Sequence, residues 1–339
     1  MEYQLTKGPL LDSNGNLAEA GYAYSLIRDY SRDQIKGLRT RIKEWDYYYI
    51  GNKDYGVALT VADNSYMWMV SASFLDFKNK IDITTSPLGF FSFGKLKLPS
   101  TSKHGDIIFK RNGLSFEFIH EDNVRHLKVH MDKFGKDKLP FNVDIKLAET
   151  NKDTMVIATP FKKKKHFYYN QKINLLKSTG IVKIGNQTYD FNDCLGVLDW
   201  GRGIWTYKNT WYWSSMNAIY NGKLIGWNLG YGFGDVSSSS ENMFFYNNQA
   251  YKLKDVKFEI PQKDGVDDFL SPWRFTSLSG DINVYFYPIL DRHSDSNVLL
   301  IRSNQHQVFG RFTGYIRIKG EEVHFEDVPG FAEKVYNRW

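Results

Sequence analysis

Apolar and polar residues alternate with a period of two along most of the chain. Leu114, Phe116 and Phe118 are separated by polar residues, and Leu127 and Val129 alternate with basic ones. Such alternation predicts strands that bury one face. Runs rich in β-branched and aromatic residues predict further strands at 282–287, 298–301 and 308–318. Helical spacing is confined to two segments, 31–43 and 331–336.

Short turn signals separate these predicted strands. They are Asp63-Asn64, Asn112-Gly113, Gly185-Asn186 and Asn221-Gly222. Asparagine and glycine accept the positive backbone dihedrals that tight hairpins need. Many short antiparallel strands at this spacing predict an all-β fold, as a barrel or a sandwich.

One pattern recurs and suggests two similar units. Trp45-Asp46 is followed by an aromatic cluster, a strand, a turn and a second strand, and Asp199-Trp200 is followed by the same succession. The polar, lysine-rich stretch at 160–171 interrupts the strand pattern between them. We therefore expect two β domains, 1–165 and 166–339, a division that suits a chain of 339 residues.

Composition and charge limit the kinds of ligand and partner to be expected. Aromatic residues make up 16% of the chain, which suits β cores and ligand cavities alike. The net charge is +6, and the most concentrated basic stretch is Lys162–Lys165, which suits a solvated loop or weak contact with an anionic membrane surface. No nucleic-acid module surrounds that run, so nucleic acid is not an expected partner.

The cysteine content and the N-terminus point to a cytoplasmic protein. A single cysteine, Cys194, cannot form a disulfide within the chain. The N-terminal residues lack the basic and apolar regions of a signal peptide, and no apolar run is long enough to span a membrane. We expect Cys194 to be a buried free thiol.

The segment 196–235 carries the most unusual chemistry. Asp199 and Arg202 stand three residues apart beside glycines, so they can pair with each other or face a substrate as acid and anion clamp. Glu241 follows in a loop rich in glycine and serine that can form the rim of a site. If Asp199 is held by Arg202, Glu241 becomes the better candidate for an acid.

Aromatic residues of the same segment can form a wall. Trp211 and Trp213 share one face of a predicted strand, and Trp227 and Tyr231 share a face of the next, with Asn228 on its opposite side. Such a wall suits a ligand pocket or an aromatic barrel core. The expected ligand-binding residues are Trp200, Trp205, Trp211, Trp213, Trp227, Asn228 and Tyr231.

Motifs of several large enzyme classes are missing from the sequence. There is no serine-hydrolase elbow, no HExxH and no dinucleotide fingerprint. His126 and His130 share a strand face, but Lys128 between them argues against a metal ion. We therefore expect neither a metal nor a cofactor.

Three blocks of the sequence resemble an uncharacterised bacterial family, domain of unknown function 2804. They are Asp199-Trp200-Gly201-Arg202-Gly203-x-Trp205 with Trp211-x-Trp213 and Asn228-x-Gly230-x-Gly232-Phe233-Gly234, then Arg41 to Tyr48, then Phe309-Gly310-x-Phe312-x-Gly314 with Gly330-x-Ala332-Glu333-Lys334. Thr206 stands where members often carry proline. The resemblance covers nearly the whole chain.

A more distant likeness is to the carotenoid 1,2-hydratase and AttH-like group. The shared order is Tyr168-Tyr169, Gly180, Asp199, Trp200, Trp211 and Trp213. This resemblance implies two lipocalin-like halves and a cavity for an apolar or lipid-like ligand. Function inferred in this way is analogy.

Three functions follow as alternatives. The first is binding of a hydrophobic, lipid- or isoprenoid-like molecule, with acid-catalysed hydration or cyclisation as its extension and Asp199 or Glu241 as the acid. The second is a carbohydrate-active protein, in which tryptophans stack on sugars and those two carboxylates flank a glycosidic bond. The third is a structural or carrier protein without catalysis.

Overall fold

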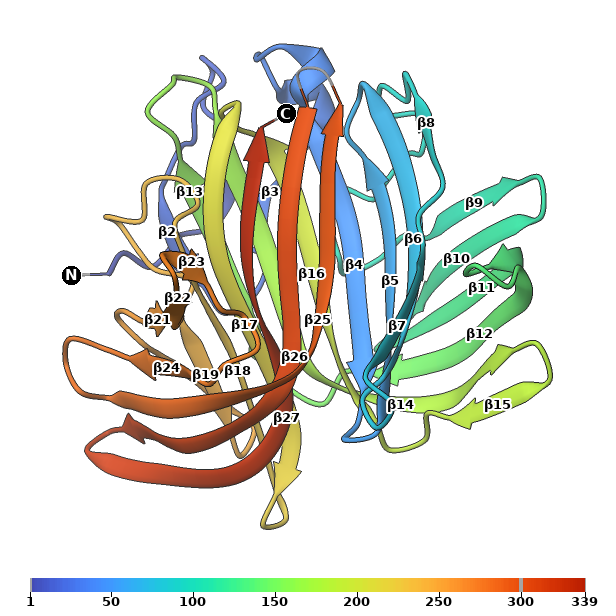
Figure 1. Cartoon of the computed structure of the whole chain (residues 1–339). Coiled ribbons are helices and arrows are strands. Elements are labelled where there is room, and N and C mark those ends of the chain that lie inside the picture. The colour runs from blue at the N-terminus through green and yellow to red at the C-terminus, as the bar shows by residue number, and fades with distance from the viewer. Residues whose placement is uncertain (1, 299–300, 339) are drawn as a thin grey trace.

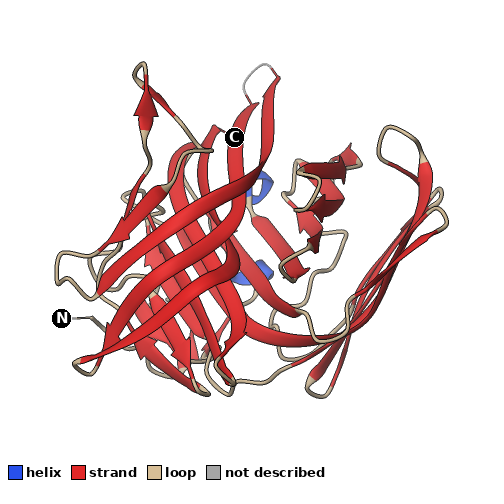
Figure 2. Cartoon of the chain, turned by 60° about the horizontal axis from the view of Figure 1, so that its bottom comes forward, coloured by secondary structure: helices blue, strands red, loops and turns tan. Residues whose placement is uncertain are grey.

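The computed structural model describes residues 2–298 and 301–338, and nearly all of them lie in strands or the turns between strands (Figure 2). Within these residues, helix is limited to two 3-10 turns, η1 (Arg32–Gln34) and η2 (Arg39–Arg41). No helix in this part of the chain is long and apolar enough to cross a membrane. The all-β prediction is confirmed.

The first large sheet is antiparallel and curls around its own core (Figure 1). Four further strands join its main path: β13 (Met155–Pro160) and β15 (Gln187–Asp190) on β14, β2 (Gly21–Ala23) on β13, and β8 (Leu88–Phe90) on β6. In spatial order the main path is β7 (Ile81–Thr85), β6 (Met67–Asp76), β5 (Tyr55–Asp63), β4 (Lys43–Gly51), β16 (Leu195–Ile204), β14 (Phe167–Ile184), β12 (Leu139–Ala148), β11 (Val124–Phe134), β10 (Leu114–Glu121) and β9 (Ile107–Arg111).

The second large sheet is also antiparallel and encloses a second core. Two small pairs complete the fold: β1 (Gly8–Pro9) with β3 (Arg28–Asp29), and β22 (Gln262–Lys263) with β23 (Val266–Asp267). The order in the second sheet is β20 (Gln249–Lys252), β19 (Met243–Tyr246), β18 (Lys223–Tyr231), β17 (Lys208–Tyr220), β27 (Glu321–Arg338), β26 (Ile301–Ile318), β25 (Ile282–Val298), β24 (Trp273–Thr276) and β21 (Lys257–Glu259).

The predicted turns are confirmed, but neither predicted helix forms as expected. Segment 31–43 holds only the 3-10 turns η1 and η2, and its last residue already belongs to β4. Asn221 and Gly222 both have positive φ, 49° and 73°, and close the β17–β18 hairpin. Segment 331–336 lies inside β27, because its side chains alternate between two packed faces instead of forming one helical stripe. Of the strand expected at 298–301, residues 299–300 lie outside the described residues.

The chain passes from the first sheet to the second between β16 and β17. The boundary expected at residue 165 falls between β13 and β14, which pair with each other within the first sheet. Trp200 does not open a second unit either, because it pairs in register with Asp46 of β4. The first occurrence of the recurring pattern lies wholly in the first sheet, whereas the second begins on β16 of that sheet and continues into β17 and β18 of the second. The division into two domains stays a prediction.

The two curled sheets pack against each other through a third apolar cluster. Strands β4, β14 and β16 meet β17, β18, β26 and β27 across this interface. Tyr49 packs on Phe309 and Phe331 there, with ring centroids 5.1 and 5.4 Å apart. The interface also holds the buried polar groups described next.

Candidate functional site

Two rows of side chains face each other across the sheet interface. In the first sheet, Lys172, Asp199 and Tyr47 are direct cross-strand neighbours on β14, β16 and β4. In the second, Trp213, Glu333 and Gln307 are such neighbours on β17, β27 and β26. Cross-strand neighbours project from the same face of a sheet, so each row presents its side chains to the other.

The rows are joined through Lys172 and Tyr47. The Lys172 Nζ atom lies 2.8 Å from Asp199 Oδ2 and 3.7 Å from the centre of the Trp213 ring. The Tyr47 hydroxyl donates a hydrogen bond of 3.2 Å to Gln307 Oε1. Asn170 donates a further hydrogen bond of 2.6 Å to Asp199 Oδ1. The ammonium is therefore held between a carboxylate and an aromatic face, a favourable position when desolvated.

Glu333 is a buried carboxyl group in the second row. Its side chain accepts hydrogen bonds of 3.0 Å from Trp211 Nε1 and 3.1 Å from Gln307 Nε2. Burial disfavours the charged form and raises the pKa of Glu333 to about 7, although the hydrogen bond from Trp211 and the charge of Lys172 oppose the shift. At neutral pH this carboxyl group can therefore both donate and accept a proton.

Glu241 is the third carboxyl group at the interface. Burial raises the pKa of Glu241, with a nearby Lys172 acting against the shift. Asn228 donates to its Oε2 atom at 3.1 Å and accepts a hydrogen bond of 2.6 Å from Trp213 Nε1. Gly230 leaves the space that Glu241 fills, since a Cβ there would lie 2.7 Å from its carboxyl carbon. Glu241, which the sequence suggests as a rim residue, thus lies among the buried polar groups of the sheet interface.

The expected pair of Asp199 with Arg202 does not form. Residues three apart on a strand point to opposite faces, so Arg202 enters the core of the first sheet. There it bonds Asp46 Oδ1 at 2.9 Å and the Pro99 carbonyl at 2.9 Å, and it lies 4.3 Å from the Trp200 ring. Asp199 takes Lys172 as its partner instead.

The expected aromatic wall is divided among three places. Trp213 lies opposite Gly230 and Trp227 opposite Met216, so the two tryptophans project from opposite faces of the β17–β18 pair. Trp200 is in the first core, and Trp227 and Tyr231 are in or against the second. The interface therefore receives Trp211, Trp213 and Asn228 from the predicted set.

Trp205 belongs to a small aromatic cluster next to these residues. Its members are Tyr168, Trp205 and Phe233, with Trp45, Phe161 and Trp211 packed against them. The Phe233 ring lies 5.2 Å from Trp211 and 5.3 Å from Trp205, edge to face in both cases. This cluster covers the side of the site on which Trp211 lies.

Lys172, Glu333, Tyr47 and Gln307 were missed by sequence reasoning. A signal for Glu333 was present, because it stands between Phe331 and Val335 on an otherwise apolar face of its strand. Gln307 shows the same pattern beside Phe309. A lone polar residue on a buried face marks a group that must find a partner.

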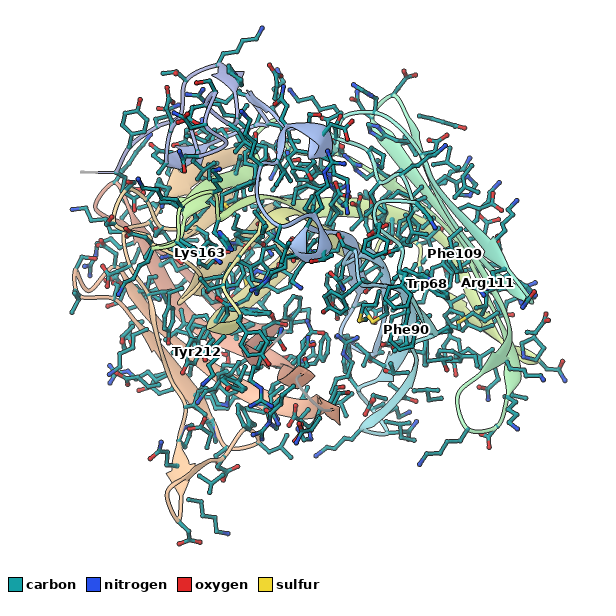
Figure 3. All side chains as sticks on the ribbon, turned by 90° about the horizontal axis from the view of Figure 1, so that it is seen from above. Trp68, Phe90, Phe109, Arg111, Lys163 and Tyr212 are labelled. Atoms are coloured by element: carbon teal, nitrogen blue, oxygen red, sulfur yellow. The ribbon has the colours of Figure 1, made fainter. Side chains whose placement is uncertain are left out.

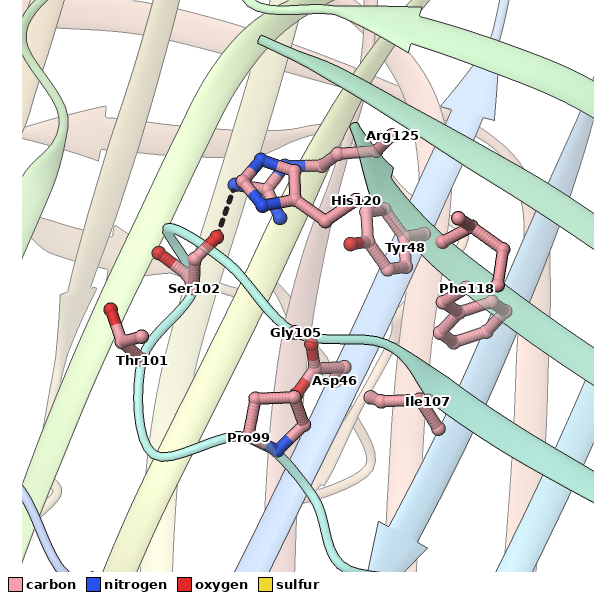
Figure 4. Close-up of a pocket in the computed structure, with 11 residues that line it drawn as sticks. Asp46, Tyr48, Pro99, Thr101, Ser102, Gly105, Ile107, Phe118, His120 and Arg125 are labelled. Carbon is pink, nitrogen blue, oxygen red and sulfur yellow. Dashed lines mark hydrogen bonds between the residues drawn. The ribbon is translucent and has the colours of Figure 1, made fainter. Parts of the chain in front are cut away.

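A small cavity lies elsewhere, inside the first sheet (Figure 4). Asp46, Tyr48, Ser102, His120 and Arg125 are among its lining residues, and Arg125 donates a hydrogen bond of 2.7 Å to the Ser102 carbonyl. Its volume of about 10 Å³ suits one water molecule. Within residues 2–298 and 301–338, no group of three histidine, cysteine or acidic side chains is placed to hold a metal ion.

The fold and family follow from comparison with known proteins. The fold is similar to that of a Nitrosomonas europaea protein described as AttH, with a TM-score of 0.56 and 10% identity over 96% of this chain and 98% of that one. The all-β, lipocalin-like architecture expected from the AttH-like resemblance is therefore confirmed. The chain belongs to the family described as domain of unknown function 2804, whose model matches residues 2–339.

Two other comparisons do not indicate a function for the chain. Kievitone hydratase from Nectria haematococca is similar at a TM-score of 0.48 and 12% identity, over 100% of this chain and 97% of that one. No functionally curated protein matches the chain in sequence.

Proposed function

We propose that the protein binds an apolar small molecule between its two sheets and that Glu333 protonates it. The observation that carries this proposal is the carboxyl group of Glu333, which has a pKa of about 7 and is buried beside Trp211 and near the Lys172–Asp199 ion pair. An acid is most effective when its pKa lies near the working pH. The substrate class that suits such a site is an unsaturated, lipid- or isoprenoid-like molecule.

The reaction that suits these groups is addition to a carbon–carbon double bond. Protonated Glu333 transfers its proton to one alkene carbon, and a positive charge develops on the other. The negative charge of the Asp199 carboxylate, on the facing row, stabilises that charge through space. Attack by water, followed by loss of a proton to Glu333, completes a hydration. Attack by a second double bond of the same molecule, followed by the same proton loss, gives a cyclisation.

The side chain of Phe233 covers the proposed entrance to the site. It stands between Gly232 and Gly234, whose φ values of 94° and 81° favour glycine, at the end of β18. Its buried ring covers Trp211 and Trp205. Rotation about the glycines would uncover the aromatic cluster without disturbing a strand. This role fits the loop after Tyr231, which the sequence suggests as a rim.

The carbohydrate alternative gains no support from these contacts. One face of Trp213 is covered by the Lys172 ammonium. Sugar stacking needs an open tryptophan face. Asp199 and Glu241 are already partnered by Lys172 and Asn228, so neither is free to flank a glycosidic bond.

A binding experiment with all-trans-retinol, an isoprenoid alcohol, tests the proposed entrance. We expect wild-type protein to bind retinol with energy transfer from tryptophan, and we expect Phe233→Ala to raise the association rate at least about threefold by removing the covering ring. Tyr287→Ala, at an exposed aromatic residue of β25, is the control. Equal association rates for Phe233→Ala and Tyr287→Ala would contradict the role of Phe233 at the entrance. If the protein binds neither retinol nor any co-purified molecule, the proposed binding site is wrong.

A second experiment tests the acid. Native mass spectrometry of freshly purified protein identifies a co-purified molecule, which is then incubated with the protein in ¹⁸O-labelled water. We expect conversion by wild type, with label incorporated in a hydration, and a loss of at least about a hundredfold in Glu333→Gln with binding retained. Glu326→Gln, an exposed change on the same strand, is the control. Unchanged turnover in Glu333→Gln would refute the role of Glu333.

A further inference from the structure

Three phenylalanines are exposed at one end of the first sheet. Phe90, Phe91 and Phe93 are 67%, 66% and 48% exposed. The φ values of Phe91 and Phe93 are 63° and 46°, a region that bulky residues rarely adopt. Their amides donate hydrogen bonds of 2.8 Å to the Tyr66 carbonyl and 2.9 Å to the Ser65 carbonyl. This phenylalanine loop, residues 90–93, is thus held in an uncommon conformation with its rings in solvent.

The phenylalanine loop is anchored from within by Ser92. This buried serine donates a hydrogen bond of 2.8 Å to Asp63 Oδ1. Asp63 in turn lies 3.8 Å from the Arg32 guanidinium. The alternation of outward phenylalanine and inward serine is therefore fixed by a buried polar contact, so the exposure of the rings is part of the fold.

Basic residues border the phenylalanine loop. No aspartate or glutamate occurs between Ile83 and Gly105, and exposed Lys95 and Lys97 follow the loop directly. Exposed Lys36, Leu38 and Arg39 lie in the η1–η2 segment. Acidic residues near this border include exposed Asp33 and exposed Asp12, whose turn at 12–16 contacts Lys165 through a hydrogen bond of 3.1 Å from the Lys165 amide to Asn16. Asp235 is also near, and its pKa is lowered chiefly by a hydrogen bond from Ser237, with Lys162 contributing.

The η1–η2 segment connects the phenylalanine loop to the lysine run at 162–165. A Cβ at Gly94 would lie 2.6 Å from Arg32 Nε, and one at Gly37 would lie 3.5 Å from the Lys165 carbonyl oxygen. Figure 3 looks down on this end of the molecule, with Lys163 and Phe90 labelled on either side of the segment. Apolar rings and a basic border therefore share one end of the fold.

We propose that this end of the molecule docks on the surface of an anionic lipid bilayer. Aromatic side chains partition to the interface between headgroups and acyl chains, and nearby lysines are attracted to anionic headgroups. The charge of the border thus complements the proposed partner, and the phenylalanine loop supplies the apolar insertion. The inference is independent of the chemistry proposed for Glu333.

Sedimentation with lipid vesicles tests the lysine run. The probes are phosphatidylcholine vesicles and vesicles with about a third phosphatidylserine. We expect wild type to bind the anionic vesicles, far less the neutral ones, and less as salt is raised. Replacing Lys162–Lys165 with glutamine should weaken binding at least about tenfold. It should leave the melting temperature unchanged, because all four side chains are exposed.

A matched control carries the same change in net charge at another place. In this control, glutamine replaces four exposed lysines: Lys133 on β11, Lys136 in the turn between β11 and β12, Lys146 on β12 and Lys183 on β14. This variant should keep its vesicle binding. Equal loss in the two variants, equal binding of wild type to both kinds of vesicle, or no binding to anionic vesicles would each overturn the proposal, the last being expected if the partner is an acidic protein.

A second pair of variants tests the phenylalanine loop. Phe91→Asn with Phe93→Asn keeps residues that tolerate positive φ while removing the rings. We expect at least about a tenfold loss of binding to anionic vesicles. Tyr285→Gln with Tyr287→Gln removes two exposed rings from β25 and should have no effect. If both pairs retain wild-type binding, the loop does not insert and the proposal fails.

Discussion

Arg202→Leu is expected to lower the free energy of unfolding by about 3–5 kcal/mol, the usual cost of stranding a buried charge. The fully buried guanidinium bonds Asp46 and the Pro99 carbonyl, and it lies 4.0 Å from Glu44. Burial already raises the pKa of Asp46 against the opposing effect of Arg202. Without Arg202, Asp46 must stay charged without its cation or take up a proton.

Urea denaturation measures this effect, and a double-mutant cycle assigns it. Arg202→Leu with Asp46→Leu should cost clearly less than the sum of the two single changes, because each residue holds the other. Arg202→Leu with Asp199→Asn should be close to additive, since Asp199 pairs with Lys172. Arg274→Leu, at an exposed position on β24, is the control for loss of an arginine. Coupling of Arg202 to Asp199 instead of Asp46 would contradict this assignment.

The stability of the wild-type protein should fall as the pH rises through the range set by Glu333. Its pKa is raised from 4.5 to about 7 in the folded state. Between these values the unfolded chain releases a proton that the folded chain retains, so the free energy of unfolding decreases with rising pH. The contribution is fully present below about pH 4.5 and lost above about pH 7.

Glu333→Gln should remove this pH dependence. The variant cannot ionise at this position, so at about pH 8 we expect it to be more stable than wild type by roughly 2–3 kcal/mol, provided that Trp211 and Gln307 still donate to the amide oxygen. Thermal unfolding followed by circular dichroism between about pH 5 and about pH 8 measures the difference. Glu326→Gln, exposed on the same strand, should follow the wild-type curve. Parallel curves for wild type and Glu333→Gln would mean that Glu333 ionises normally in the folded protein.

The linear sequence determined the local structure and the family. Alternation at 114–118 and 124–131 became β10 and β11, and Asn221-Gly222 became a hairpin turn because positive φ at both residues is a local property. The burial of Cys194 also followed from its apolar neighbours. The blocks around Asp199 and Trp211 matched a family that the comparison then showed. These features depend on residues close together in the chain.

Tertiary structure alone decided which side chains meet. Alternation places Asp199 and Arg202 on opposite faces once a strand is assigned, but it does not say what lies against each face. Lys172 reaches Asp199 because β14 and β16 pair in one register, and Trp213 meets Lys172 because two sheets pack face to face. Glu333 lies more than 130 residues from Asp199 in sequence, so their approach depends on long-range strand pairing and sheet packing, which no local pattern encodes.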